Sequence, residues 1–294
     1  MHKVKIAYFG TPDFSAAFLE MILNDSELPV EVKYVFTQPD ARAGRLQKLT
    51  PSPARQKAEQ YGIHVVTDLN NAQSLLKEVD LALLFAYGKI IPKALLDAPR
   101  YGFWNIHPSM LPKYRGPAPM ATPLLNGDNE TGITLMKMDE EMDHGPIIAQ
   151  QSCYIFPTWR RDQLEKHLIE LSYELFKKIL STYSSDLSSA PFIEQNHVDA
   201  SYTQRMKKDD GYIPLADLKL SSINQKKEIF NKFRAYYPWP GVWTKIMING
   251  SEKRVKLTKI HWENGDLVIK KVQLEGKNEV EYAQFMKAYA SLTS

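Results

Sequence analysis

Short runs of apolar residues alternate with helical patterns over the first 155 residues of the chain. Runs rich in Val, Ile, Leu and Phe predict strands, whereas apolar positions three or four residues apart predict helices. Alternation of this kind is typical of a mostly parallel sheet flanked by helices. The expected strands are 4–9, 32–36, 64–66, 81–85, 103–106, 131–137 and 147–155, and the expected helices are 14–24, 53–60, 72–77, 119–126 and 161–180.

A different pattern follows a polar stretch of small residues at 185–205, which reads as a linker. A helix is expected at 224–235 and short strands at 243–248, 253–260 and 266–271. Two Asn-Gly pairs, at 249–250 and 264–265, predict tight hairpins between these strands. We therefore expect a Rossmann-like α/β domain at 1–184, a linker at 185–205 and a small OB-like β-barrel domain at 206–294.

Composition narrows the class of protein only moderately. The 294 residues have a mean hydropathy of −0.37 and contain no apolar run of 18 residues, so we expect no membrane span. A single cysteine rules out an internal disulfide and favours the reducing cytoplasm. Charge is more informative, because residues 200–294 contain 17 Lys and Arg against 10 Asp and Glu, whereas residues 1–199 contain 20 against 24. The basic second part suits a polyanionic partner, or is simply a solvated basic face.

One constellation of polar residues stands out, at Asn105, His107 and Asp143. Residues 105 and 107 lie in one expected strand and so point to the same face. An amide donor, an imidazole and a carboxylate together suit acyl transfer, in which an amine attacks and an oxyanion develops. A single one of these residues fits a strand cap or a satisfied buried ring better than a catalytic role, but the full set favours catalysis.

Two other kinds of site are not supported by the sequence. The turn at Gly10-Thr11-Pro12 lacks the G-x-G-x-x-G pattern of dinucleotide-binding folds. His107 and His144 are the only histidines near the constellation and no cysteines are paired, so we expect no metal.

The pattern Asn105-x-His107-x-Ser109, followed by Leu111-Pro112, Arg115-Gly116 and Asp143, resembles the folate-dependent formyltransferase superfamily. Three further segments resemble its methionyl-tRNA formyltransferase branch: residues 9–14, residues 36–53 and Pro238-Trp239-Pro240. The resemblance covers nearly the whole chain. It implies transfer of a formyl group from 10-formyltetrahydrofolate to the α-amino group of initiator methionyl-tRNA, by a monomeric cytoplasmic enzyme that needs no metal.

The resemblance also implies site roles. Asn105 would stabilise the oxyanion, His107 would assist it and relay protons, and Asp143 would orient His107 and aid deprotonation of the amine. Folate would be bound by two loops and the RNA by a basic loop that enters its acceptor end. The residues carried over are Phe85, Ala86, Tyr87, Gly88, Ile91, Ser109, Met110, Leu111 and Pro112 for folate, with a cis Leu111–Pro112 bond, and Arg42, Arg45 and Lys48 for tRNA.

Alternatives to this function remain open at the level of sequence. The basic loop at 42–48 could be a solvated flexible loop, and the chain could formylate a sugar-nucleotide amine or hydrolyse formyltetrahydrofolate. A non-catalytic tRNA-binding protein on the same scaffold is a further alternative, although binding alone does not require Asn105, His107 and Asp143 together.

Overall fold

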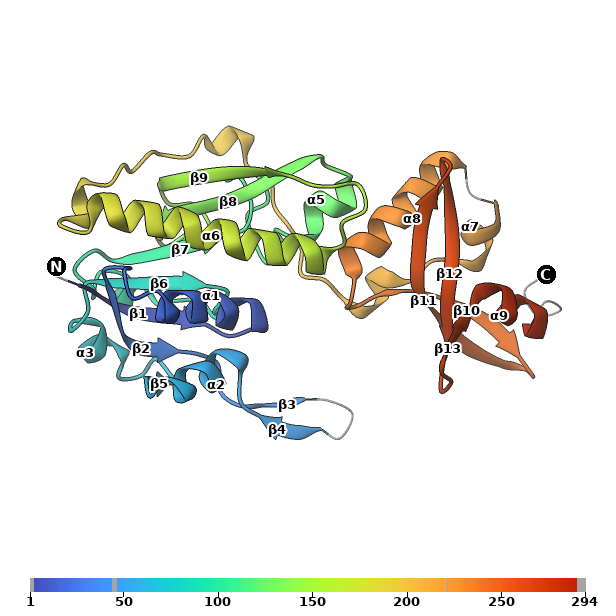
Figure 1. The fold of residues 1–294 in the computed structure, drawn as a ribbon, viewed down its shortest axis with the longest axis horizontal. Coiled ribbons are helices and arrows are strands. Elements are labelled where there is room, and N and C mark those ends of the chain that lie inside the picture. The colour runs from blue at the N-terminus through green and yellow to red at the C-terminus, as the bar shows by residue number, and fades with distance from the viewer. Residues whose placement is uncertain (1–2, 44–46, 221, 290–294) are drawn as a thin grey trace. The chain divides into compact units, whose positions relative to one another are not determined.

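The computed structural model describes residues 3–43, 47–220 and 222–289, and the chain divides into two units (Figure 1). The first unit comprises Met1–Gly116, Gly132–Cys153 and Glu165–Tyr202, and the second comprises Pro117–Thr131, Tyr154–Leu164 and Thr203–Ser294. Each unit is therefore built from segments that are far apart along the chain.

The first unit is organised around a seven-stranded sheet of order β5-β2-β1-β6-β7-β8-β9. Strands β5, β2, β1, β6 and β7 pair in parallel, and β8 runs antiparallel to β7. These strands are β1 (Val4–Gly10), β2 (Val30–Phe36), β5 (His64–Val66), β6 (Leu81–Phe85), β7 (Phe103–His107), β8 (Glu130–Lys137) and β9 (Ile147–Tyr154). A separate two-stranded hairpin is formed by β3 (Ala41–Ala43) and β4 (Lys48–Thr50).

Both faces of the sheet are covered, since every residue of β6 and β7 is buried. Tyr8 and Phe9 are neighbours on β1 and point to opposite faces: Tyr8 stacks with Phe18, and Phe9 packs against Phe36 and Phe103. The helices of this unit are α1 (Asp13–Asn24), α2 (Pro53–Gln60), α3 (Ala72–Leu76), α4 (Lys93–Leu96) and α6 (Arg161–Tyr183), with 3₁₀ turns η1 (Leu187–Ser189) and η2 (His197–Asp199). Helices α1 and α6 lie on the Tyr8 face and α3 and α4 on the Phe9 face.

The second unit has its own core, centred on Phe233, Val242 and Val255. It holds a four-stranded antiparallel sheet of order β10-β11-β12-β13, with hairpins at Asn264-Gly265 and Asn249-Gly250. Its elements are α5 (Ala121–Asn126), η3 (Lys208–Gly211), α7 (Leu215–Leu220), α8 (Ile223–Tyr236), β10 (Val242–Ile248), β11 (Ser251–Glu263), β12 (Asp266–Leu274), β13 (Glu279–Glu281) and α9 (Tyr282–Tyr289).

The expected fold class is confirmed: a mostly parallel, Rossmann-like α/β sheet is followed by a small β domain, which here takes the form of the four-stranded sheet. Every strand and helix expected from the sequence is present. The sequence does not predict β3, β4, α4, β13, α7 and α9. The first four have only three or four residues each, which leaves too little periodicity to detect. Within the described ranges, no helix is long and apolar enough to cross a membrane.

Candidate active site

The three predicted catalytic residues meet beyond the carboxyl end of β7. Asn105 and His107 belong to β7 and are both buried, and their side chains lie on the same face. Asp143 belongs to the segment between β8 and β9, and its side chain is only partly exposed. In sheets of this type the carboxyl ends of the strands are where ligands bind. The observed position is therefore the one expected from the sequence.

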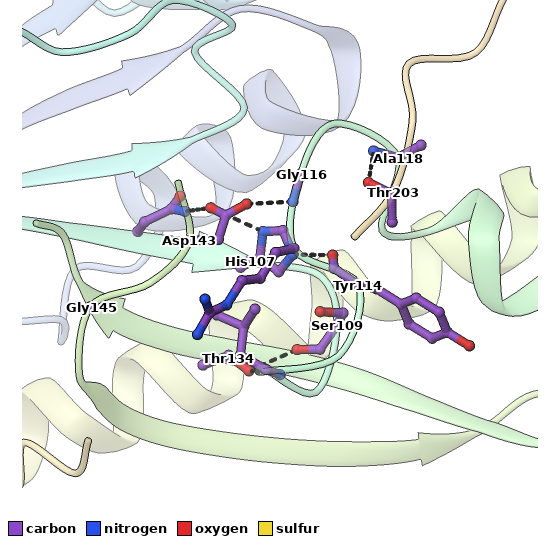
Figure 2. Close-up of polar contacts among 12 residues, drawn as sticks. His107, Ser109, Tyr114, Gly116, Ala118, Thr134, Asp143, Gly145 and Thr203 are labelled. Atoms are coloured by element: carbon purple, nitrogen blue, oxygen red, sulfur yellow. Dashed lines mark hydrogen bonds and ion pairs between the residues drawn. The ribbon is translucent and has the colours of Figure 1, made fainter. Parts of the chain in front are cut away.

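The carboxylate of Asp143 is the centre of this group (Figure 2). Its Oδ1 atom accepts a hydrogen bond from Asn105 Nδ2 at 3.3 Å and lies 3.5 Å from His107 Nδ1. Its Oδ2 atom accepts from the backbone N–H of Gly116 at 2.7 Å. Asp143 has a φ of +51°, in the left-handed region that non-glycine residues seldom adopt. Contacts at both carboxylate oxygens hold this side chain in place.

The hydrogen bonding of His107 constrains where its protons lie. Its Nε2 atom is 2.9 Å from the backbone carbonyl of Tyr114. Because a carbonyl can only accept, Nε2 carries a hydrogen, and in a neutral ring Nδ1 then has the lone pair. That lone pair would face the carboxylate of Asp143 at 3.5 Å, which is repulsive unless a proton lies between the two groups. With no proton between them, His107 Nδ1 and the Asp143 carboxylate therefore form a site that can accept one proton.

The segment Ser109–Pro112 follows β7 directly, and the predicted cis Leu111–Pro112 bond is confirmed. Ser109 and Leu111 are buried, while Met110 and Pro112 are half-buried. The hydroxyl of Thr134, on β8, donates to the Ser109 carbonyl at 2.7 Å and accepts from the Leu111 N–H at 3.1 Å. This fixes the loop against the sheet.

A second loop, Ala86–Ile91, leaves the end of the neighbouring strand β6. Ala86 and Gly88 both have positive φ, of 56° and 82°, which turns the chain sharply after the buried Phe85. The carbonyl of Tyr87 accepts from Thr11 Oγ1 at 2.8 Å and from Gln38 Nε2 at 3.1 Å. The φ of Gly88 favours glycine, and a Cβ there would lie 2.5 Å from Gln38 Nε2 and push the amide away from the Tyr87 carbonyl. The side chain of Ile91 is buried.

Two of the predicted tRNA-binding residues belong to the β3–β4 hairpin. Arg42 lies on β3 opposite Leu49, Lys48 lies on β4 opposite Ala43, and both Arg42 and Lys48 are exposed. Arg45 lies outside the described residues. The base of the hairpin is anchored to α2, because Arg55 forms an ion pair with Asp40 at 2.9 Å.

Several residues of the site carry no signal in the sequence. Thr134 and Gln150 support the Ser109–Pro112 loop, Gln150 through a 2.8 Å bond from Nε2 to the Leu111 carbonyl. Gln195 was placed in the expected linker, yet it is buried and its amide contacts the backbone of Asp143 and Gly145. Such long-range partners have no motif, since only the fold brings them together. The limits proposed for the linker and the two domains remain predictions.

A family model for formyl transferases matches residues 3–180, which is more than half of the chain. The chain belongs to the formyl transferase family. The match contains both loops and all of the residues Asn105, His107 and Asp143.

Relatives in this family are similar over most of the chain. A methionyl-tRNA formyltransferase from Kosmotoga olearia is 38% identical over 261 residues, covering 86% of this chain and 78% of that protein. A protein of the same name from Natranaerobius thermophilus is 30% identical over 317 residues and covers 97% of each chain. The resemblance found in the motifs is therefore confirmed by whole-chain similarity.

Solved structures in the family share the fold at lower sequence identity. A 4-N formyltransferase from Francisella tularensis has a TM-score of 0.65 at 21% identity, covering 86% of this chain and 96% of that one. An N-formyltransferase from Helicobacter canadensis, solved with folinic acid and dTDP-3-aminofucose, has a TM-score of 0.60 at 21% identity and covers 95% and 98%.

Proposed function

We propose that this protein transfers the formyl group of 10-formyltetrahydrofolate to the α-amino group of initiator methionyl-tRNA. The observation that carries the proposal is the convergence of Asn105 and His107 on the carboxylate of Asp143. The relatives named methionyl-tRNA formyltransferase support the choice of acceptor, since they are similar over 86% and 97% of the chain.

The residues divide the chemistry between charge stabilisation and proton movement. Bound folate supplies an activated formyl group. The Asn105 amide is a fixed donor for the formyl oxygen, on which negative charge develops as the amine attacks; removal of one such donor typically slows an enzyme by about 10²–10³-fold. The His107–Asp143 pair takes up the proton that the attacking ammonium must lose, and His107 can then return it to the departing nitrogen.

The folate would lie between the two loops that end β6 and β7. Both loops are held by hydrogen bonds from outside themselves, through Tyr87 in one and Ser109 in the other. Their backbones are thus fixed before a ligand arrives, which lowers the entropy cost of binding. The folinic acid bound to the Helicobacter canadensis enzyme makes a reduced folate the natural donor class to test first.

The RNA would be engaged by the β3–β4 hairpin and by the basic second unit. Arg42 and Lys48 are exposed cations on a hairpin that is anchored at its base, an arrangement suited to phosphate contacts. The excess of Lys and Arg over Asp and Glu in residues 200–294 adds a sequence-independent attraction that salt should weaken.

The test is single-turnover transfer of labelled formyl from 10-formyltetrahydrofolate to charged initiator methionyl-tRNA, with elongator methionyl-tRNA in parallel. We expect transfer to the initiator and much less to the elongator. No transfer to either, together with formylation of an amino-sugar nucleotide or hydrolysis of the donor, would replace this proposal with one of those activities. Tight binding of many tRNAs with no chemistry would instead indicate a binding protein.

A further inference from the structure

The loop that carries Asp143 is held by a segment that arrives much later in the chain. We name residues 139–145 the acid loop and residues 195–202 the return segment. The amide of Gln195, in the return segment, donates from Nε2 to the Asp143 carbonyl at 2.9 Å and to the Gly145 carbonyl at 2.8 Å. One buried side chain therefore holds the backbone on both sides of His144.

The orientation of the Gln195 amide is fixed by Arg115. Oε1 of Gln195 accepts from Arg115 Nη2 at 2.7 Å and from Arg115 Nε at 3.2 Å. A guanidinium can only donate and the two loop carbonyls can only accept, so the amide cannot turn over without losing bonds on both sides. Both side chains are buried, with 2% of Arg115 and 4% of Gln195 exposed, so water cannot replace those bonds cheaply.

A second contact joins the return segment to the acid loop. The ring of His197 stacks on the ring of His144, with centroids 4.0 Å apart and planes inclined by 2°. Arg115 Nη2 is 2.8 Å from His197 Nδ1, which must accept because arginine cannot. His144 is tied within the acid loop by a 2.7 Å contact between Nδ1 and Asp139 Oδ2.

The other end of Asp143 is held by the residue next to Arg115. The Gly116 N–H donates to the Asp143 carboxylate at 2.7 Å, while the Gln195 amide donates to the main-chain carbonyl of Asp143. Asp143 is thus restrained at its backbone and at its carboxylate. The first restraint comes from Arg115 through Gln195, and the second comes directly from Gly116. This double restraint keeps a non-glycine residue at a φ of +51°.

We propose that Gln195 is a positioning residue, which through the acid loop sets the Asp143 carboxylate against His107 and Asn105. The inference rests on the proposed function, because it assigns the loop a part in formyl transfer. A displacement of about 1 Å in a catalytic group can cost roughly 10²-fold in rate. Loss of the Gln195 donor should therefore lower kcat with little change in folate binding.

The decisive variant is Gln195→Glu. A glutamate keeps an acceptor for Arg115 but replaces the N–H donor by a carboxylate oxygen, which the two loop carbonyls repel, so the contact to the acid loop is lost while the one to Arg115 remains. Gln195→Asn is the second variant, because its side chain is too short to serve Arg115 and the loop together. The matched control is Gln151→Glu, at an exposed position on β9 whose amide donates to the neighbouring Ser152 carbonyl.

The experiment measures single-turnover formyl transfer, the Kd of 5-formyltetrahydrofolate and the melting temperature for each variant, alone and combined with Asp143→Asn. We expect kcat to fall by about 10–100-fold in the Gln195 variants, with Kd within threefold of the wild type and no change in the control. In the Asp143→Asn background the same substitutions should cost less than about threefold, because the group they position is already absent.

Three results would overturn the inference: wild-type kcat in both variants, an equal fold-loss with and without Asp143, or failure of both variants to fold. The last two would assign Gln195 to the stability of the whole unit. A wild-type protein that formylates no methionyl-tRNA would refute the proposed function instead, so the two failures are separable.

Discussion

Replacement of Asp143 by asparagine tests the chemistry most directly. The substitution keeps the shape of the side chain but exchanges one acceptor oxygen for an NH₂ donor. If the remaining oxygen keeps the Gly116 N–H, the NH₂ group faces Asn105 Nδ2, which is also a donor, and His107 Nδ1. The new amide can donate to the His107 lone pair, so the pair can no longer take up a proton between its two members.

The size of the effect follows from this loss. Positioned general acid–base groups contribute about 10²–10⁴-fold to rate, which corresponds to ~3–5 kcal/mol in the barrier. We expect kcat of Asp143→Asn to fall within this range. Folate binding should change by less than threefold, because both folate loops are held by groups other than Asp143. The melting temperature should drop by only a few degrees, since the contact with Gly116 survives as a neutral hydrogen bond.

The assay is single-turnover transfer of labelled formyl at saturating folate and RNA, which separates chemistry from binding and release. Asp97→Asn is the control, because Asp97 is exposed at the end of α4. A folded Asp143→Asn protein that retains turnover within threefold of the wild type would remove the carboxylate from the mechanism. It would also refute the argument that His107 and Asp143 take up a proton between them.

Three further predictions concern folate binding, RNA binding and acid stability. Thr134→Val removes a buried hydroxyl that holds the Ser109–Pro112 loop. We expect urea titration to show a loss of ~1–3 kcal/mol in the free energy of unfolding. Steady-state kinetics should show a higher KM for folate at nearly unchanged kcat. The double variant Arg42→Gln, Lys48→Gln should weaken the binding of every tRNA, whatever its sequence, and leave hydrolysis of the formyl donor unchanged. The slope of the logarithm of the tRNA association constant against the logarithm of the salt concentration should become shallower by about 2. An unaltered slope would show that the hairpin takes no part in RNA binding. The Lys177 ammonium bound to Asp25 holds the pKa of that carboxyl well below its usual range, so its stabilisation is present above the unfolded pKa of about 3.9 and is lost as pH falls below it. Asp25→Asn should therefore lower the melting temperature at pH 7 and flatten its decline between pH 5 and pH 3; parallel melting curves for the two proteins would contradict this.

The sequence predicts the fold well because most of its elements are long or strongly patterned. The strand β6 is one continuous apolar run, and an Asn-Gly pair marks each of the first two hairpins of the second unit. The catalytic constellation is also local in character: residues 105 and 107 share one strand, and Asp143 precedes a Gly-Pro turn. Periodicity and the order of strands were sufficient to bring all three to one edge.

The remainder of the site could not be predicted, for a physical reason. Thr134 and Gln150 act through single hydrogen bonds to the backbone of another strand or loop, and any polar residue at the same register would look alike in the sequence. Gln195 lies in a polar stretch whose composition is that of a linker, and its hydrogen bonds to Arg115 and the acid loop give it a fixed conformation. The amino-acid composition of a segment predicts whether it is exposed to water, but it does not identify the backbone groups, distant in the sequence, to which its side chains form hydrogen bonds.

The separation of Gln195 from the acid loop has a consequence for the order in which the site is completed during synthesis. The two contacts of its amide span 52 and 50 residues, and α6 is made in between. The strands of the sheet and both loops proposed to bind folate leave the ribosome first, so a nascent chain can form them while Asp143, the proposed general base, is still loosely held. We therefore expect the enzyme to gain its full reactivity only after residue 195 has emerged and docked, late in the production of a unit whose sheet is already assembled.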